Sequence, residues 1–183
     1  MQKVRFIQQK ARRQGKRVYR VDIGFKNAFN ATSQALLWRV MRMFRIPDVD
    51  LLEQIYEGTT VRLAPNDDES AKITFNTGIA QGFITSPHLF NIFINSLLRM
   101  LTVTGQNEDI SHGLQIGKDQ KGDNQRDESG YQFNNIGFID NISIFADTPE
   151  GMQNLLNVVQ EFTAWCGMQI DVKKTHVLVI HND

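Results

Sequence analysis

Basic side chains gather at the start of the sequence, in a pattern suited to binding a polyanion. Eight of the 20 Lys and Arg residues fall within residues 1–20, which hold no acid. The other 163 residues therefore carry 12 bases against all 20 acids, a net charge of −8 in a chain whose total is zero. The eight bases are Lys3, Arg5, Lys10, Arg12, Arg13, Lys16, Arg17 and Arg20. This asymmetry predicts one edge that faces a polyanion; the alternative is a helix with a solvated basic face.

Several other kinds of site are excluded by residue counts. Cys166 is the single cysteine, which rules out a disulfide framework and a zinc site of several cysteines. The histidines show no ligand spacing, so we expect no zinc site from His88, His112, His176 and His181. A lone cysteine favours a reducing, intracellular setting and leaves nucleus and cytoplasm open.

Length and composition predict one folded domain. The chain has 183 residues, of which 41% are hydrophobic and 22% charged, so it is not a disordered or fibrous sequence. No apolar run approaches the roughly 18 residues of a membrane span. The polar, basic N-terminal segment does not resemble a secretory signal. We therefore expect no membrane partner.

The first half of the sequence predicts helices separated by a strand and a hairpin. Strand residues are rich in β-branched side chains, and apolar residues at helical spacing mark the segments around them. The expected elements are a helix over Met1–Lys16, a strand over Val18–Ile23, a helix that Thr32 or Ser33 caps and Pro47 ends, a helix over Val49–Glu57, and a hairpin of Val61–Leu63 and Lys72–Phe75 around Asn66–Ser70.

The second half predicts a long helix followed by a hairpin. Ser86 and Pro87 mark the helix start, because a hydroxyl cap precedes proline at the first helical position. Asp140 and Asn141 form a two-residue connection between apolar runs, which is typical of a tight β-hairpin. The remaining expected elements are the hairpin strands Ile136–Ile139 and Ile142–Ala146, a mobile loop over Gly117–Gly130, a helix over Pro149–Trp165 and a strand over Val177–Ile180. This order predicts an α+β fold with helices on one face of an antiparallel sheet.

Four segments, in this order, resemble the conserved motifs of reverse transcriptases, especially those of non-LTR retroelements. The resemblance covers roughly residues 18–180. The segments are Phe25–Asn30 for motif A, Ala80–Gly82 with Ser86-Pro87 and Leu89–Asn91 for motif B, Phe138–Asn141 with Ile144–Asp147 for motif C, and Trp165, Gly167 and Lys173–Thr175 for motif D. Each segment is weak alone, and the order and spacing carry the resemblance.

The resemblance implies a polymerase palm domain that builds DNA on a template. Such an enzyme is an RNA-directed DNA polymerase, which takes an RNA or DNA template-primer and dNTPs and uses two Mg²⁺ or Mn²⁺ ions for nucleotidyl transfer. By the same resemblance, residues 1–17 are a basic helical remnant of the fingers and residues 18–183 are the palm. No thumb is expected.

The resemblance implies three carboxylates at the metal site, and this sequence departs from that pattern twice. Gly24 stands four residues before the motif A alanine, where the family has aspartate, and Asn141 replaces the second aspartate of motif C. Asp140 keeps the first aspartate position. Asp22 would lie about 6.6 Å, or two strand residues, from the required place, unless a bulge at Gly24 moves it into the site. The alternative for Asp22 is a polar residue near a strand end.

Other site residues follow from the same motifs. Phe29 resembles the ring under the incoming sugar, the alternative being a core aromatic. Gln81 and Gly82 resemble contacts to the template–nucleotide pair, and Lys174 the motif D lysine that pairs with or protonates pyrophosphate; the alternative for Lys174 is a solvated lysine. The residues expected along a nucleic-acid backbone are Arg12, Arg13, Lys16 and Arg17.

Three hypotheses remain open from the sequence. The first is a fragment of a reverse transcriptase descended from a retrotransposon, with a defective metal site and little or no activity. The second is a non-catalytic, palm-like module, a pseudoenzyme that binds nucleic acid or protein. The third is a folded remnant with no retained task. An exposed sheet face also predicts self-association.

Overall fold

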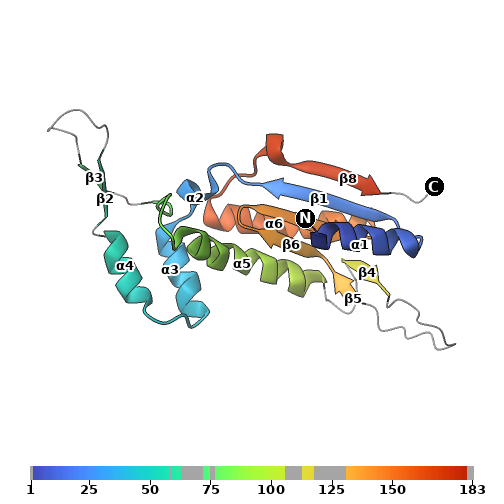
Figure 1. The fold of residues 1–183 in the computed structure, drawn as a ribbon, viewed down its shortest axis with the longest axis horizontal. Coiled ribbons are helices and arrows are strands. Elements are labelled where there is room, and N and C mark those ends of the chain that lie inside the picture. The colour runs from blue at the N-terminus through green and yellow to red at the C-terminus, as the bar shows by residue number, and fades with distance from the viewer. Residues whose placement is uncertain are drawn as a thin grey trace.

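A four-stranded antiparallel sheet with the strand order β6-β7-β1-β8 forms the centre of the molecule (Figure 1). Its strands are β1 (Val18–Gly24), β6 (Asn135–Phe138), β7 (Asn141–Ala146) and β8 (His176–Ile180). The structure, a computed structural model, describes residues 2–57, 59–62, 72–74, 77–105, 113–117 and 131–180. Strand β1 lies between β7 and β8, so its residues have neighbours on both sides.

Two long helices, α5 (Ser86–Gly105) and α6 (Pro149–Cys166), cover one face of this sheet. Alternate residues of the inner strands, such as Ile23 and Ile144, join their apolar faces in the main core. Phe93 of α5 is fully buried, and its ring centroid lies 5.8 Å from that of Phe162 on α6. The expected α+β fold with helices packed on one face of an antiparallel sheet is confirmed for α5 and α6.

The helix α1 (Gln2–Arg13) packs elsewhere, against the opposite side of the sheet. Ile7 and Ala11 are buried in a second apolar cluster with Val18 and Phe145, whose neighbours in sequence belong to the main core. Because successive strand residues point to opposite faces, this second cluster lies on the face that α5 and α6 leave open. The apolar stripe of α1 thus holds the basic segment on the sheet.

Helices begin and end close to the capping residues that the sequence offers. Ser33 caps α3 by accepting a hydrogen bond from the Leu36 N–H at 3.4 Å, and the Thr148 hydroxyl accepts one from the Gly151 N–H at 3.0 Å at the start of α6. The short helical elements are α2 (Ala28–Ala31), α3 (Gln34–Met43), α4 (Val49–Glu57) and the 3₁₀ turn η1 (Val172–Lys174). The sequence did not predict α2 and η1, which are single turns.

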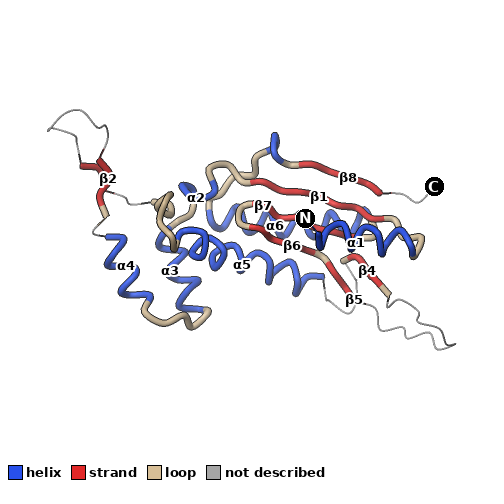
Figure 2. The backbone as a smooth tube through the Cα atoms, in the orientation of Figure 1, coloured by secondary structure: helices blue, strands red, loops and turns tan. Residues whose placement is uncertain are grey.

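Two further strand pairs flank the central fold, as the tube in Figure 2 shows. They are β2 (Thr60–Arg62) with β3 (Lys72–Thr74), and β4 (Leu114–Ile116) with β5 (Tyr131–Phe133). The first pair was predicted; the second was not, because its short strands flank a polar segment. The predicted turn over Asn66–Ser70 and the predicted loop over Gly117–Gly130 lie outside the described residues.

The predicted hairpin at Asp140 is confirmed as the β6–β7 connection. Phe138 pairs with Asn141, and Ile139 takes a left-handed backbone with φ of 54°. A β-branched residue at positive φ is unusual, so this tight turn is held by its surroundings. Among the described residues, no helix is long and apolar enough to cross a membrane.

Candidate active site

The ladder between β1 and β7 brings motif A to the tip of the motif C hairpin. Its pairs run without interruption from Tyr19 opposite Ala146 to Gly24 opposite Asn141. This ladder contains no bulge at Gly24, so the alternative in which a bulge moves Asp22 into the metal site is wrong. Asp22 stays opposite Ser143, two residues from Gly24 along the strand.

Asp22 is engaged by two neighbours on the same sheet face. Arg20 donates from Nε to Asp22 Oδ1 at 2.8 Å and places Nη2 2.7 Å from Oδ2. The Ser143 hydroxyl donates to the same Oδ1 at 2.5 Å. A carboxylate held by a bidentate arginine and a hydroxyl has its charge compensated within the fold. Because both of its oxygens are engaged in this way, Asp22 does not have the geometry of a metal ligand.

The hairpin tip offers one carboxylate. Asn141 donates from Nδ2 to Asp140 Oδ1 at 3.2 Å, and the asparagine side chain is exposed. Hard divalent cations prefer several oxygen ligands, with carboxylates supplying the charge. Within the described ranges, His, Cys, Asp and Glu side chains form no group of three or more that could hold a metal ion.

The side chain of Lys174 lies against Gly24, at the place where a motif A carboxylate would start. A Cβ atom built on Gly24 would be 2.7 Å from Lys174 Cβ and 3.3 Å from its Cδ, well inside the 3.5–4.0 Å at which carbon atoms pack. The residues present therefore do not fit the two-ion site that the family resemblance implies. The structure pairs Gly24 with Asn141 and packs the Lys174 stem against Gly24, which leaves no room for a carboxylate side chain at residue 24.

Motifs A and B meet where Phe29 and Asn30 contact the segment that carries Ile79 and Gln81. The Ile79 N–H donates to the Phe29 carbonyl at 2.8 Å, and Gln81 Nε2 donates to Asn30 Oδ1 at 3.4 Å. The Phe29 ring stacks on buried Phe90 with centroids 5.0 Å apart, yet Phe29 itself is half-buried. Gly82 has a φ of 93°, which favours glycine, and open space where a Cβ would be. Phe29, Gln81 and Gly82 thus lie in one region, as their motifs predict.

The basic residues of the N-terminal segment lie away from this end of the sheet. Arg17 directly precedes β1, whose seven residues place Gly24 at its far end, about 20 Å along the strand. Lys16 donates from Nζ to the Gln115 carbonyl at 2.5 Å, and Arg17 Nη1 donates to the Tyr19 hydroxyl at 3.5 Å. Arg12 and Arg13 are exposed on α1.

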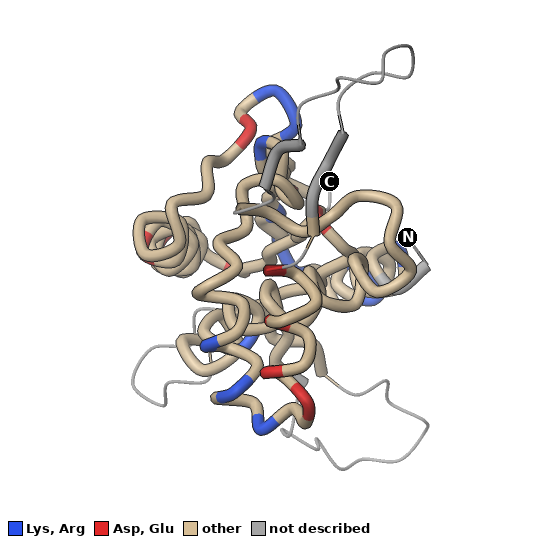
Figure 3. The backbone as a smooth tube through the Cα atoms, turned by 90° about the vertical axis from the view of Figure 1, so that its left-hand side faces the viewer, with Lys and Arg blue, Asp and Glu red and all other residues tan. Residues whose placement is uncertain are grey.

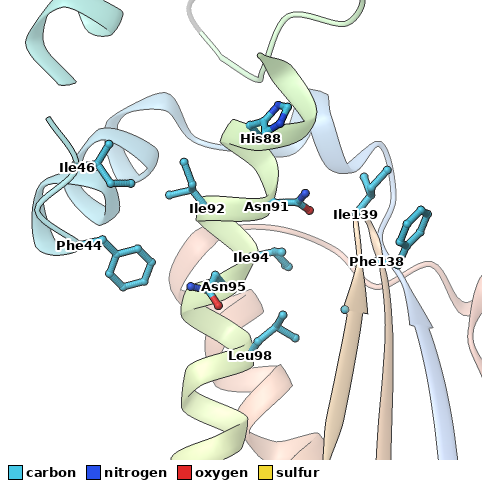
Figure 4. A pocket seen from close by; sticks show the side chains of 11 residues that line it. Phe44, Ile46, His88, Asn91, Ile92, Ile94, Asn95, Leu98, Phe138 and Ile139 are labelled. Atoms are coloured by element: carbon cyan, nitrogen blue, oxygen red, sulfur yellow. The ribbon is translucent and has the colours of Figure 1, made fainter. Parts of the chain in front are cut away.

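A groove of about 590 Å³ lies beside the hairpin tip, between α5 and the β6–β7 turn. Figure 4 shows His88, Asn91 and Asn95 along α5 and Phe138 with Ile139 across from them. The three polar residues are spaced to share one helix face, and their side chains are suited to hydrogen bonds with bases or sugars. The sequence did not predict this groove; the i, i+3, i+7 spacing of these three polar residues on α5 was the available signal.

Comparison with known proteins finds a matching family and a related sequence. A family model described as "Reverse transcriptase (RNA-dependent DNA polymerase)" matches residues 1–181. The chain is 26% identical over 158 residues to a Drosophila melanogaster protein named "Retrovirus-related Pol polyprotein from type-2 retrotransposable element R2DM". The match takes in 85% of this chain and 13% of that protein, so the chain spans a small part of its relative.

Solved structures of telomerase share the fold. The apo enzyme of Candida tropicalis, truncated from its C-terminal domain, gives a TM-score of 0.67 at 9% identity, covering 98% of this chain and 34% of that one. Telomerase of Candida albicans, solved with a fragment of telomeric RNA, gives 0.58 at 11% identity, covering 97% and 29%. At these identities the likeness concerns the fold alone.

The contact between Gly24 and Lys174 predicts a coupled stability effect. We expect Gly24→Ala to lower the free energy of unfolding by about 1–3 kcal/mol, because the new methyl group overlaps the Lys174 stem. In a Lys174→Gly background, the same substitution should cost much less. Urea unfolding of the four proteins in this double-mutant cycle measures the difference, and equal costs in both backgrounds would contradict the contact.

Proposed function

This chain belongs to the reverse transcriptase family, and we propose that it is a palm domain that binds nucleic acid with little or no remaining nucleotidyl transfer. In this proposal residues 1–17 are the basic remnant of the fingers and residues 18–183 are the palm. Its ligands are an RNA or DNA template-primer and, by kinship, dNTPs. The proposed loss of activity rests on the position of Gly24, which pairs with Asn141 and packs against the Lys174 side chain.

The electrostatics of the site support this loss. Two divalent ions at one site need closely placed negative charge, and one carboxylate supplies far less attraction than three. Asp140 is the acid that the motif alignment retains, while the charge of Asp22 is compensated by Arg20. The two-metal mechanism therefore describes the ancestor, and Mg²⁺ or Mn²⁺ would be held weakly at this hairpin tip.

Nucleic-acid binding is supported by the position of the basic helix. The apolar side of α1 is buried on the open sheet face, which leaves Arg12 and Arg13 exposed. Phosphate contacts from such residues carry most of the affinity of sequence-independent binding. This function needs no metal ligand, so the substitutions at Gly24 and Asn141 do not remove it.

Self-association through the edge strand β8 is a second proposal, carried by a separate observation. Val177, Leu178 and Val179 are 70%, 41% and 45% exposed, and β8 pairs with β1 on one side alone within the described residues. An exposed apolar edge strand favours pairing with another strand. Two antiparallel copies centred on Leu178 set Val177 opposite Val179 and place no Lys, Arg, Asp or Glu in the pairing.

Primer extension tests the proposed loss of activity. In a chain that carries complete fingers and thumb, the palm as it stands should show background extension. In a Lys174→Gly background, which makes room for the new side chain, restoring Gly24→Asp together with Asn141→Asp should raise the rate by about 100-fold or more, equivalent to about 2.7 kcal/mol of transition-state stabilisation. Unrestored protein that extends a primer as well as the restored one would contradict the proposal.

Salt dependence tests the nucleic-acid surface. We expect the affinity for a primer–template duplex to fall steeply with salt, and Arg12→Gln with Arg13→Gln to reduce the log–log slope by up to about 0.9 for each phosphate that the variant no longer neutralises. Fluorescence anisotropy measures the slope. Arg42→Gln is the matched control, since Arg42 on α3 is engaged by Asp50 and Glu53. A flat salt response of the unaltered chain would favour a remnant with no binding task.

A charge on the edge strand tests self-association. Sedimentation velocity should show a dimer that dissociates in Val177→Lys, because the added ammonium groups must be buried or repelled at the paired edge. Val103→Lys on α5 is the control, as Val103 is 71% exposed and far from β8 in sequence. A monodisperse monomer at high concentration, or equal effects of both substitutions, would contradict pairing through β8.

A further inference from the structure

Two large apolar side chains are exposed on the loop that leads into α5. Ile84 is 90% exposed, the highest value among the large apolar residues of the described chain, and its neighbour Phe83 is 46% exposed. Single apolar residues are common on protein surfaces, but these two are adjacent in sequence. Removing such side chains from water is favourable, so the pair is suited to a contact that the described part of the chain does not supply.

The loop that carries this pair lies beside α2 (Figure 1) and is fixed to the fold at both ends. At its start, Ile79 is fully buried, and its N–H donates to the Phe29 carbonyl at 2.8 Å. At its end, the Ser86 N–H donates to the Phe83 carbonyl at 3.1 Å, and the Ser86 hydroxyl donates to the Ala80 carbonyl. The two apolar side chains therefore start from a preorganised backbone, which lowers the entropy cost of binding.

The sequence around this loop is free of acidic residues over two long stretches. Residues 23–47 and 70–107 contain no Asp or Glu, and the hydrogen bonds of Ile79 and Gln81 join the loop in the second stretch to the first. Figure 3, a view onto this end of the molecule, shows long stretches of backbone without an acidic residue. The bases of the two stretches are Lys26, Arg39, Arg42, Arg45, Lys72 and Arg99. Even without Arg42, which pairs with acids of α4, this charge favours a polyanion as the occupant.

We propose that Phe83 and Ile84 form an apolar wedge, which enters a base step of bound duplex nucleic acid and separates the two stacked bases. The inference rests on the proposed function, which supplies the duplex. Unstacking a base step costs free energy, and the burial of apolar side chains between the bases offsets that cost. Gln81, whose Nε2 lies 3.4 Å from Asn30 Oδ1, places a neutral amide beside the wedge, and amides of this kind contact base edges.

Fluorescence of 2-aminopurine tests the wedge, because this base analogue is quenched while stacked and brightens when it is unstacked. The probes are primer–template duplexes that carry 2-aminopurine at successive positions, each titrated with the full chain. We expect the fluorescence to rise at one or a few adjacent positions. Ile84→Ser should abolish this rise and leave the salt slope of binding unchanged, because it alters no phosphate contact, whereas Ile84→Leu should retain the rise.

A mismatched duplex provides a second measurement. A mismatch at the responsive position lowers the cost of separating the bases. The unaltered chain should therefore bind the mismatched duplex about tenfold more tightly than the paired one, a part of the cost of one unstacked step. Ile84→Ser should bind both duplexes alike, as fluorescence anisotropy measures.

Val103→Ser is the matched control, because Val103 is 71% exposed on α5 and loses a β-branched side chain in the same way. The inference is overturned if bound duplex brightens at no position or if Ile84→Ser and Val103→Ser behave alike. It is also overturned if Ile84→Ser changes the sedimentation of the free chain and leaves the fluorescence of bound duplex unaltered, which identifies a protein contact. Salt-dependent binding without brightening leaves the proposed function intact, whereas no binding of any duplex defeats both.

Discussion

The pairing of β1 between β7 and β8 is the constraint on which the site depends. Its register decides which residues of β1 face α5 and α6 and which face the open side of the sheet, and a slip of one residue would exchange the two sets. With the observed register, Val21 and Ile23 enter the main core, while Arg20 and Asp22 lie on the open face. The same register sets Gly24 at the hairpin tip.

On the open face of the sheet, the negative charge of Asp22 is compensated by contacts within the fold. Asp22 is the single acid of β1, and both of its oxygens are used by Arg20 and Ser143. Forming such an ion pair costs free energy of desolvation, which the bidentate hydrogen bonds largely offset. Its net contribution to stability is therefore modest. Its chemical effect is larger, because the strand offers no free carboxylate to a cation.

Scaffold and site have different physical requirements, which explains how one persists as the other changes. The fold is held by buried apolar side chains on α5, α6 and the inner strands, and neither Gly24 nor Asn141 belongs to that core. Exchanging an acid for glycine at a strand end removes a desolvated charge and costs little packing. The fold can therefore tolerate the residues found at Gly24 and Asn141 without loss of its core.

Local sequence signals determined most of the elements. The serine and threonine caps, Gly167 in its left-handed conformation and the spacing of apolar residues predict the helices to within a few residues, and the apolar runs around Asp140 predict the hairpin. The departures at Gly24 and Asn141 are equally visible from the sequence, since they depend on position within a motif.

Tertiary structure alone decided the rest. Four features join residues that are distant in sequence. They are the docking of α1 on the open face, the β4–β5 pair, the groove beside Ile139 and the hydrogen bond from Ser143 to Asp22. The contact between Gly24 and Lys174 is the clearest case, because 150 residues separate them. Sheet register and the path of η1 determine that contact, and neither is encoded in the residues on either side of Gly24.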